Sequence, residues 1–124
     1  MRFLHGIIGN SSEINVETVE KDLERFLLDG ENVDRAFVVI RDLMVFTNKR
    51  LILIDKQGVT GKKKEYRSIP YKSILHFSIE TNGHFEIDAE LKIFIKEESL
   101  PVVKKFTRDG NIFDVQKTLL KYMI

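Results

Sequence analysis

Three four-residue apolar runs decide the fold of this chain: Phe37-Val38-Val39-Ile40, Leu43-Met44-Val45-Phe46 and Leu51-Ile52-Leu53-Ile54. The joints between them, Arg41-Asp42 and Thr47-Asn48-Lys49-Arg50, are short and polar, as in β-hairpins. A strand with one face in water alternates apolar and polar residues. These runs do not alternate, so we expect both faces of the sheet that they form to be covered.

Apolar patterns and turn residues on either side of these runs extend the prediction to an antiparallel sheet protein. Arg41-Asp42 and Asn48-Lys49 are each predicted to fill a two-residue hairpin loop, and Asn82-Gly83 is the strongest hairpin signal in the chain. The predicted strands lie near residues 33–41, 43–47, 50–55, 63–69, 74–81, 85–96 and 102–108.

The strand predicted at 85–96 alternates cleanly, with one apolar face and one polar face. Phe94 is the exception, because it falls on the polar face between charged residues. Two interpretations of Phe94 stay open: a single exposed aromatic side chain, which is common on protein surfaces, or a contact between subunits.

Helices are predicted at both ends of the sheet region. Val16, Val19, Leu23, Phe26 and Leu27 form one apolar stripe after the N-cap residue Asn15, and Gly30 ends this helix. A shorter helical turn is predicted near residues 11–14. A second helix, with a broad apolar stripe, is predicted to cap the open end of the sheet. The predicted organisation is a single domain, 1–124, with an N-terminal helical extension at about 11–30, a barrel at about 33–108 and a C-terminal helix at about 111–123.

Composition limits the functional classes. The 124 residues suffice for one domain with a real core. The net charge of +1 lacks the basic excess of a nucleic-acid-binding domain, so we expect no nucleic-acid partner. The absence of cysteine excludes disulfides and thiolate metal sites and fits a cytoplasmic location. The first residues are too short and broken for an export signal.

The order of seven strands and a terminal helix resembles the pleckstrin-homology-like barrel, which has two nearly orthogonal sheets and a C-terminal capping helix. Residues 46–55 resemble the second-to-third-strand hairpin of bacterial pleckstrin-homology-like and GRAM domains, and residues 69–74 resemble the turn after their fourth strand. Residues 56–63, and residues 83–85 followed by 89–93, are similar to the bacterial family in particular. The resemblance implies a family of largely unknown function whose members tend to form ring-like homo-oligomers. Eukaryotic relatives often bind phosphoinositides through a basic loop that Arg41-Asp42 replaces here.

One dense group of basic residues is a candidate site for an anion or a lipid. It consists of Lys56, Lys62, Lys63, Lys64 and Arg67. Lysines near an anionic membrane contribute about 1 kcal/mol each. The alternative is a solvated loop whose lysines protect a sheet edge, and alternation sends Lys63 and Lys64 to opposite faces.

No pattern in the sequence indicates catalysis, a cofactor or a metal. His84, Glu86 and Asp88 share one strand face, but neighbours at this spacing lie roughly 6.5–7 Å apart, too far to converge comfortably on one ion. His5 and His76 stand in no nucleophile or base motif. We therefore predict no catalytic residues, no cofactor and no metal site.

The apolar runs also bear on function. One amphipathic helix is not expected to cover three doubly apolar strands, and each large side chain left in water forgoes roughly 1.5–3 kcal/mol of burial. We therefore predict a non-catalytic interaction or scaffold module that assembles with itself, in one form as a ring, and that is able to hold an unidentified protein partner. The alternative is peripheral binding of a membrane or anionic ligand through the basic 56–67 loop.

Overall fold

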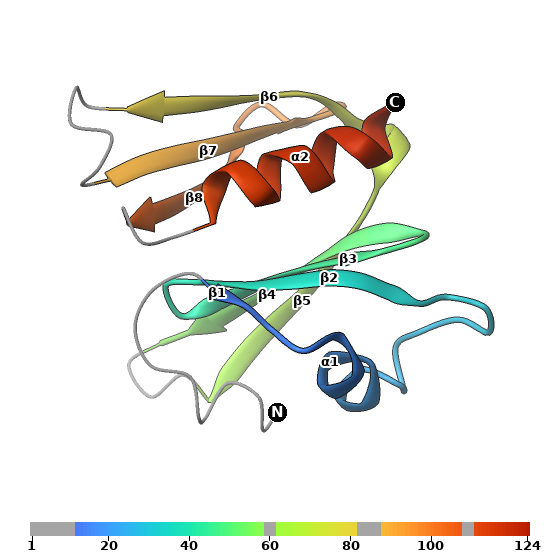
Figure 1. Ribbon diagram of the computed structural model, residues 1–124. Coiled ribbons are helices and arrows are strands. Elements are labelled where there is room, and N and C mark those ends of the chain that lie inside the picture. The colour runs from blue at the N-terminus through green and yellow to red at the C-terminus, as the bar shows by residue number, and fades with distance from the viewer. Residues whose placement is uncertain (1–11, 59–61, 82–87, 108–110) are drawn as a thin grey trace.

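The structure is a computed structural model that describes residues 12–58, 62–81, 88–107 and 111–124. Short strands dominate it, with one helix near each end (Figure 1). In chain order the elements are β1 (Ser12–Glu13), α1 (Val16–Asp22), β2 (Val33–Val39), β3 (Asp42–Thr47), β4 (Arg50–Gln57), β5 (Lys63–Pro70), the 3₁₀ turn η2 (Tyr71–Ser73), β6 (Ile74–Thr81), β7 (Asp88–Ile95), β8 (Val102–Thr107) and α2 (Ile112–Met123).

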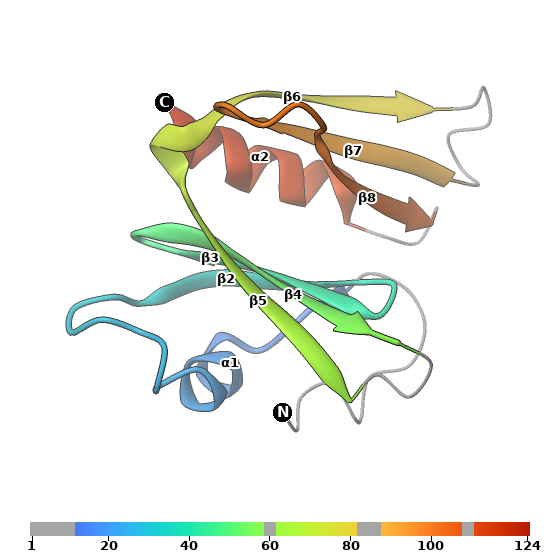
Figure 2. The same cartoon turned by 180° about the vertical axis from the view of Figure 1, so that it is seen from behind.

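These strands form two antiparallel sheets with the orders β1-β2-β3-β4-β5 and β6-β7-β8. Without the two-residue β1, they are the seven strands predicted from the sequence, and the predicted pleckstrin-homology-like architecture is confirmed. Two details of the prediction are wrong. The sheets face each other as a sandwich and do not close into one barrel, and Ser12–Glu13 is a strand paired with β2, where a helical turn was expected (Figures 1 and 2).

An inner core fills the space between the two sheets. The inward side chains of β2, β3 and β4 meet those of β7 and β8, and α2 adds Ile112, Val115 and Leu119. In β7 the predicted alternation holds for the described positions, because Ala89, Leu91, Ile93 and Ile95 are all buried. Phe113 and Leu120 on α2 remain exposed, so only part of its broad apolar stripe is used.

An outer core lies on the other face of the five-stranded sheet. Alternate residues of the same apolar runs, such as Val38, Val45 and Ile54, pack there with Val19 and Leu23 of the α1 region. Figures 1 and 2 show α1 on the side of this sheet that faces away from β6, β7 and β8. The expectation that both faces are covered is confirmed, since the members of both cores among the three runs are at most 2% exposed.

The cover of the outer face comes from the same chain: α1 provides part of it, and residues outside this helix provide the rest. Val16 of α1 packs against the outer core, and Ile14, Leu27 and Tyr66, which lie outside the helix, extend the area that α1 alone would shield. Apart from Ile40 at the hairpin tip, the three apolar runs therefore need no second subunit to keep them from water.

Two local predictions need correction. α1 begins after its predicted cap, where the Asn15 side chain accepts a hydrogen bond from the Thr18 amide at 3.1 Å, but it ends at Asp22 and continues as turns. The first hairpin loop consists of Ile40 and Arg41, because Val39 pairs with Asp42. The second loop is Asn48-Lys49 as predicted, between β3 and β4.

No helix in the described part of the chain is long and apolar enough to cross a membrane.

Candidate functional site

The predicted basic residues lie on the β4–β5 hairpin but divide between its two faces. Lys56 and Lys64 are cross-strand partners, next to the outer-face pair Ile54 and Tyr66. Lys63 is opposite Gln57, and neighbouring residues of a strand point to opposite faces. The hairpin thus does not gather its lysines on one surface.

Arg67 and Lys62 behave differently from the other members of this group. Arg67 forms an ion pair with Glu98 in the connection between β7 and β8, and Lys62 also has an interaction partner. Among the described residues, no ion pair joins Lys56, Lys63 or Lys64 to an acid, and these lysines are the ones left to attract an anion.

A further cation joins this end of the molecule from the β2–β3 hairpin. Arg41 donates a hydrogen bond to the Gly58 carbonyl at 3.0 Å, so the tips of the two hairpins are in contact. The charges of Arg41 and Asp42 do not cancel locally, because Asp42 accepts a hydrogen bond from the Lys56 amide at 2.9 Å and lies 3.6 Å from Lys104. We call Arg41, Lys56, Lys63 and Lys64 the cationic end.

Lys104 is a buried lysine that sequence analysis missed. Its ammonium donates to Asp55 at 2.7 Å and connects β8 with β4 across the sandwich. Lys104 is 7% exposed, and a buried charge needs such partners to offset its lost hydration. Lys104 lies on the inward-facing side of β8, opposite Leu91 of β7. The alternation of inward and outward residues along β8 is the sequence signal that could have identified it.

Phe94 lies on the outer face of the β6-β7-β8 sheet and is partly buried by a neighbour. It pairs with His76 across β6 and β7, and the two rings stack with centroids 4.4 Å apart. Lys92 and Glu80 on the same sheet face form an ion pair at 3.0 Å. Phe94 and His76 therefore form one aromatic patch on an otherwise polar surface.

The strand β6 has one free edge among the described strands, because it pairs with β7 alone. Native proteins usually protect such edges with charged residues, proline or short length. β6 is eight residues long and carries one formal charge, at Glu80, whereas the other long edge strand, β5, carries Lys63, Lys64, Glu65 and Arg67.

Apolar side chains accompany this edge. Leu75, at the bulge near the start of β6, is 58% exposed, and Phe77 and Ile79 pack on the inner core yet stay partly open to solvent. Apolar side chains are therefore open to solvent along β6.

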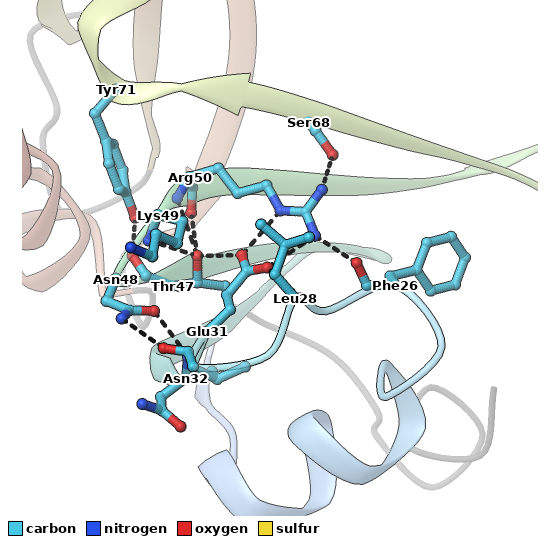
Figure 3. A network of polar contacts seen from close by, with 12 residues as sticks. Phe26, Leu28, Glu31, Asn32, Thr47, Asn48, Lys49, Arg50, Ser68 and Tyr71 are labelled. Atoms are coloured by element: carbon cyan, nitrogen blue, oxygen red, sulfur yellow. Dashed lines mark hydrogen bonds and ion pairs between the residues drawn. The ribbon is translucent and has the colours of Figure 1, made fainter.

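The hairpin between β3 and β4, which carries the family resemblance, holds a buried carboxylate (Figure 3). Glu31 accepts hydrogen bonds from the Leu28 amide at 3.0 Å, from the Thr47 hydroxyl at 2.7 Å and from the Arg50 guanidinium at 2.9 and 3.0 Å. Burial disfavours its charge, but the bonds from Arg50, Leu28 and Thr47 outweigh this, and the pKa of Glu31 is lowered.

Asn48 completes the attachment of this hairpin to the chain that follows α1. Its side chain accepts a hydrogen bond from the Asn32 amide at 2.7 Å and donates to the Gly30 carbonyl at 3.0 Å (Figure 3). Gly30 has φ +82°, which favours glycine. These residues of the β3–β4 hairpin thus hold the segment 26–32 against the sheet, and their polar groups form structural hydrogen bonds.

The described residues contain no group of three or more histidine, cysteine or acidic side chains that could hold a metal ion. His5, His84 and Glu86 lie outside the described residues, and Asp88 begins β7. His76 stacks on Phe94. The absence of catalytic residues stays a prediction.

The two-sheet sandwich with its C-terminal helix defines a pleckstrin-homology-like domain. The family model for bacterial PH domains matches residues 2–123, and the chain belongs to this family.

Relatives of similar length have no assigned function. The chain is 54% identical over 120 residues to the uncharacterized protein YjqA of Bacillus subtilis, covering 96% of each chain. It is 31% identical over 110 residues to the uncharacterized protein YozO of the same organism, covering 89% of this chain and 94% of the relative.

Solved structures agree with the fold. A DUF1696 family protein with a pleckstrin-homology domain from Shewanella loihica is 47% identical, with a TM-score of 0.81, and the match covers 94% of this chain and 100% of the other. A pleckstrin homology domain from Shewanella amazonensis is 48% identical, with a TM-score of 0.83, and 98% of each chain is covered.

Proposed function

We propose that this bacterial PH domain is a non-catalytic scaffold module that assembles with itself. The free edge of β6 is the observation that carries the proposal. An edge strand with a single charge and several apolar side chains is a ready template for pairing with another chain, and natural proteins seldom leave one open. The three apolar runs do not support self-assembly, because α1 and the residues packed beside it cover their outer face within one chain.

The sheet beside β6 supports a contact of useful size. Leu75, Phe77 and Ile79 lie along the edge strand, with Phe77 and Ile79 on its inner side, and the Phe94–His76 patch lies on the outer face of the same sheet. Aromatic side chains are enriched in subunit interfaces. In this proposal Phe94 contacts a neighbouring subunit, and the assembled surface is what an unidentified protein partner would meet.

Light scattering tests this proposal through the absolute mass in solution. We expect the wild-type chain at tens of micromolar to exceed its monomer mass of 14.5 kDa several-fold. Leu75→Lys should shift the mass toward that of the monomer, because a charge on an edge strand opposes pairing. Phe94→Ala should weaken the assembly in the same direction.

A matched control separates the edge from general surface charge. Leu100→Lys changes a side chain that is 77% exposed in the β7–β8 connection and should leave the mass unchanged. Circular dichroism checks that each variant keeps its fold. A wild-type mass of 14.5 kDa under these conditions would refute the self-assembly proposal.

The cationic end favours a second candidate function, binding of an anionic membrane surface. The Arg41–Gly58 contact adds a cation to Lys56, Lys63 and Lys64, and Asp42 is occupied elsewhere. Ile40, 48% exposed at the hairpin tip with φ 61°, adds an apolar side chain to the same end. Lysines near anionic lipid attract at about 1 kcal/mol each.

Flotation with phosphatidylglycerol-containing vesicles tests this second function. Lys64→Glu should reduce the bound fraction, whereas Lys117→Glu, on the exposed side of α2, should not. Equal recovery of the wild type with neutral and anionic vesicles would rule out an electrostatic contact with lipid.

A further inference from the structure

A pocket of about 400 Å³ lies where three distant parts of the chain meet. The β3–β4 hairpin, the η2 turn and the end of α2 each contribute to its wall. It is at the opposite end of β4 from the cationic end, and none of its lining residues belongs to β6 or to the cationic end. Its lining residues are Lys49, Pro70, Tyr71, Lys72, Tyr122 and Met123.

Two stacked tyrosines form the rigid part of this pocket. The rings of Tyr71 and Tyr122 are nearly parallel, 7° apart, with centroids separated by 4.5 Å. The Tyr71 hydroxyl donates to the Thr47 carbonyl at 2.6 Å, and the Tyr122 hydroxyl donates to Asp34 at 2.8 Å. Because both hydroxyls are tied into the protein, the rings present carbon surface to the pocket.

The tyrosine hydroxyls also stay protonated at neutral pH. Burial, the hydrogen bond to Asp34 and the charge of that carboxylate raise the pKa of Tyr122 to about 12. Burial is likewise the largest cause of the raised pKa of Tyr71. The aromatic wall therefore carries no negative charge that would repel an anion.

Two lysines at the wall have no acidic partner among the described residues. Lys49 and Lys72 are exposed, and no ion pair involves either of them. The nearby Lys121, by contrast, lies 3.1 Å from Asp34, so that carboxylate is already paired. The pocket thus combines a fixed aromatic wall with two uncompensated positive charges.

We propose that this pocket binds a small anion that carries a flat ring, with the ring against the carbon surface that the stacked Tyr71–Tyr122 pair leaves open and the anionic group at Lys49 and Lys72. Bases stack on aromatic side chains without need for specific hydrogen bonds, and ammonium groups bind phosphates and carboxylates. The volume suits a ligand the size of a nucleotide or smaller. A nucleoside monophosphate and an aromatic carboxylate share this chemistry.

Nuclear magnetic resonance of the tyrosine rings tests the proposal directly. The chain has three tyrosines and no tryptophan, so Tyr66 on the outer face serves as an internal reference. Titration with adenosine 5′-monophosphate or with benzoate should shift the Tyr71 and Tyr122 ring signals and leave Tyr66 unmoved. We expect a dissociation constant below about 1 mM for at least one of these probes.

Two partial ligands show whether both halves of the pocket contribute. Adenosine lacks the anion and inorganic phosphate lacks the ring, so each should bind at least about tenfold more weakly than adenosine monophosphate if the nucleotide is the better probe. If benzoate is the better probe, benzyl alcohol and acetate take their place. Whichever probe binds more tightly identifies the source of the ligand.

Variants link the binding to the named lysines. Lys49→Ala and Lys72→Ala should each raise the dissociation constant about three- to tenfold, and Lys117→Ala, an exposed lysine elsewhere on α2, should not change it. The proposal is overturned by the absence of saturable ring shifts at about 5 mM of both probes. It is also overturned by binding that neither lysine variant alters, or by a partial ligand that binds as tightly as its parent.

Discussion

Removal of one side chain from the outer core tests whether the chain covers its own sheet. Leu23 is fully buried at the end of α1, packed in the outer core against the β2-β3-β4 face. Leu23→Ala removes its methyl groups from that site and leaves a cavity, because α1 is held by backbone hydrogen bonds such as Leu23 N–H to Val19 O at 2.9 Å. Fully buried leucines lose about 2–5 kcal/mol on this change.

A cost of about 3 kcal/mol is the value we expect here, since the site is completely buried. For a chain of 124 residues this corresponds to a fall in Tm of about 10–15 °C. The variant should still fold at 25 °C, because small domains have roughly 5–15 kcal/mol of stability. Urea unfolding followed by circular dichroism gives the free energy directly.

Leu28→Ala is the matched control from the same segment. Leu28 is 64% exposed, so its truncation should change the free energy of unfolding by less than about 0.5 kcal/mol. The difference between the two variants should not depend on protein concentration, because the cover is intramolecular. Equal unfolding free energies for Leu23→Ala and Leu28→Ala would refute the view that α1 completes a core.

Three other substitutions test the polar contacts. Because the folded-state pKa of Glu31 is lowered from its ordinary value of 4.5, its stabilisation is complete above about pH 4.5 and is lost as the pH falls through the folded pKa. Glu31→Gln should therefore lose less stability than the wild type between pH 7 and pH 3 in urea titrations; an identical slope would contradict this. Lys104→Met leaves Asp55 without its cation and should cost about 1–2 kcal/mol, since Asp55 still reaches water. A double-mutant cycle with Asp55→Asn measures the coupling, and a coupling of zero would contradict the ion pair. Asn48→Ala should cost about 1–2 kcal/mol through its lost bonds to Asn32 and Gly30, and a midpoint unchanged in urea would show that the hairpin needs no such anchor.

The strands were predictable because their signals are local. Apolar runs separated by turn residues place β3 and β4 within a few residues, and Asn48-Lys49 marks their loop. The first loop was misplaced by one residue, because Ile40 adopts φ 61°, a conformation that a β-branched residue seldom takes. Sequence propensity argues against such a position, and only the pairing of Val39 with Asp42 fixes it.

The length of α1 and the closure of the outer face depend on tertiary contacts that a periodic pattern does not contain. Phe26 belongs to the predicted helical stripe, but its ring stacks on Tyr66 of β5 with centroids 4.6 Å apart. Leu27 packs on the outer core from the irregular segment that follows the turns at the end of α1. The stripe thus predicted which residues meet the sheet, although the backbone that carries them differs.

The candidate sites show the same limit. Alternation along β5 indicates that Lys63 and Lys64 face opposite sides, and the register of β4 and β5 agrees with it. The contact between Arg41 and Gly58 joins the tips of two hairpins, and the tyrosine pair joins η2 to α2 across about fifty residues of sequence. Such long-range contacts follow from the assembled fold and leave no pattern in a short stretch of sequence.

A sheet with a core on each face has few places left for binding. The broad surfaces of β2, β3 and β4 are occupied by the two cores, so contacts with other molecules must use strand edges, hairpin tips, the ends of the sandwich or the outer face of the β6-β7-β8 sheet. The β6 edge, the cationic end and the tyrosine pocket are three such places. Substitutions in either core should therefore alter stability and leave binding constants unchanged in the folded fraction. Substitutions at Leu75, Lys64 or Lys72 should do the reverse, because Leu75 and Lys72 are exposed, Lys64 is half-buried, and none of the three belongs to either core.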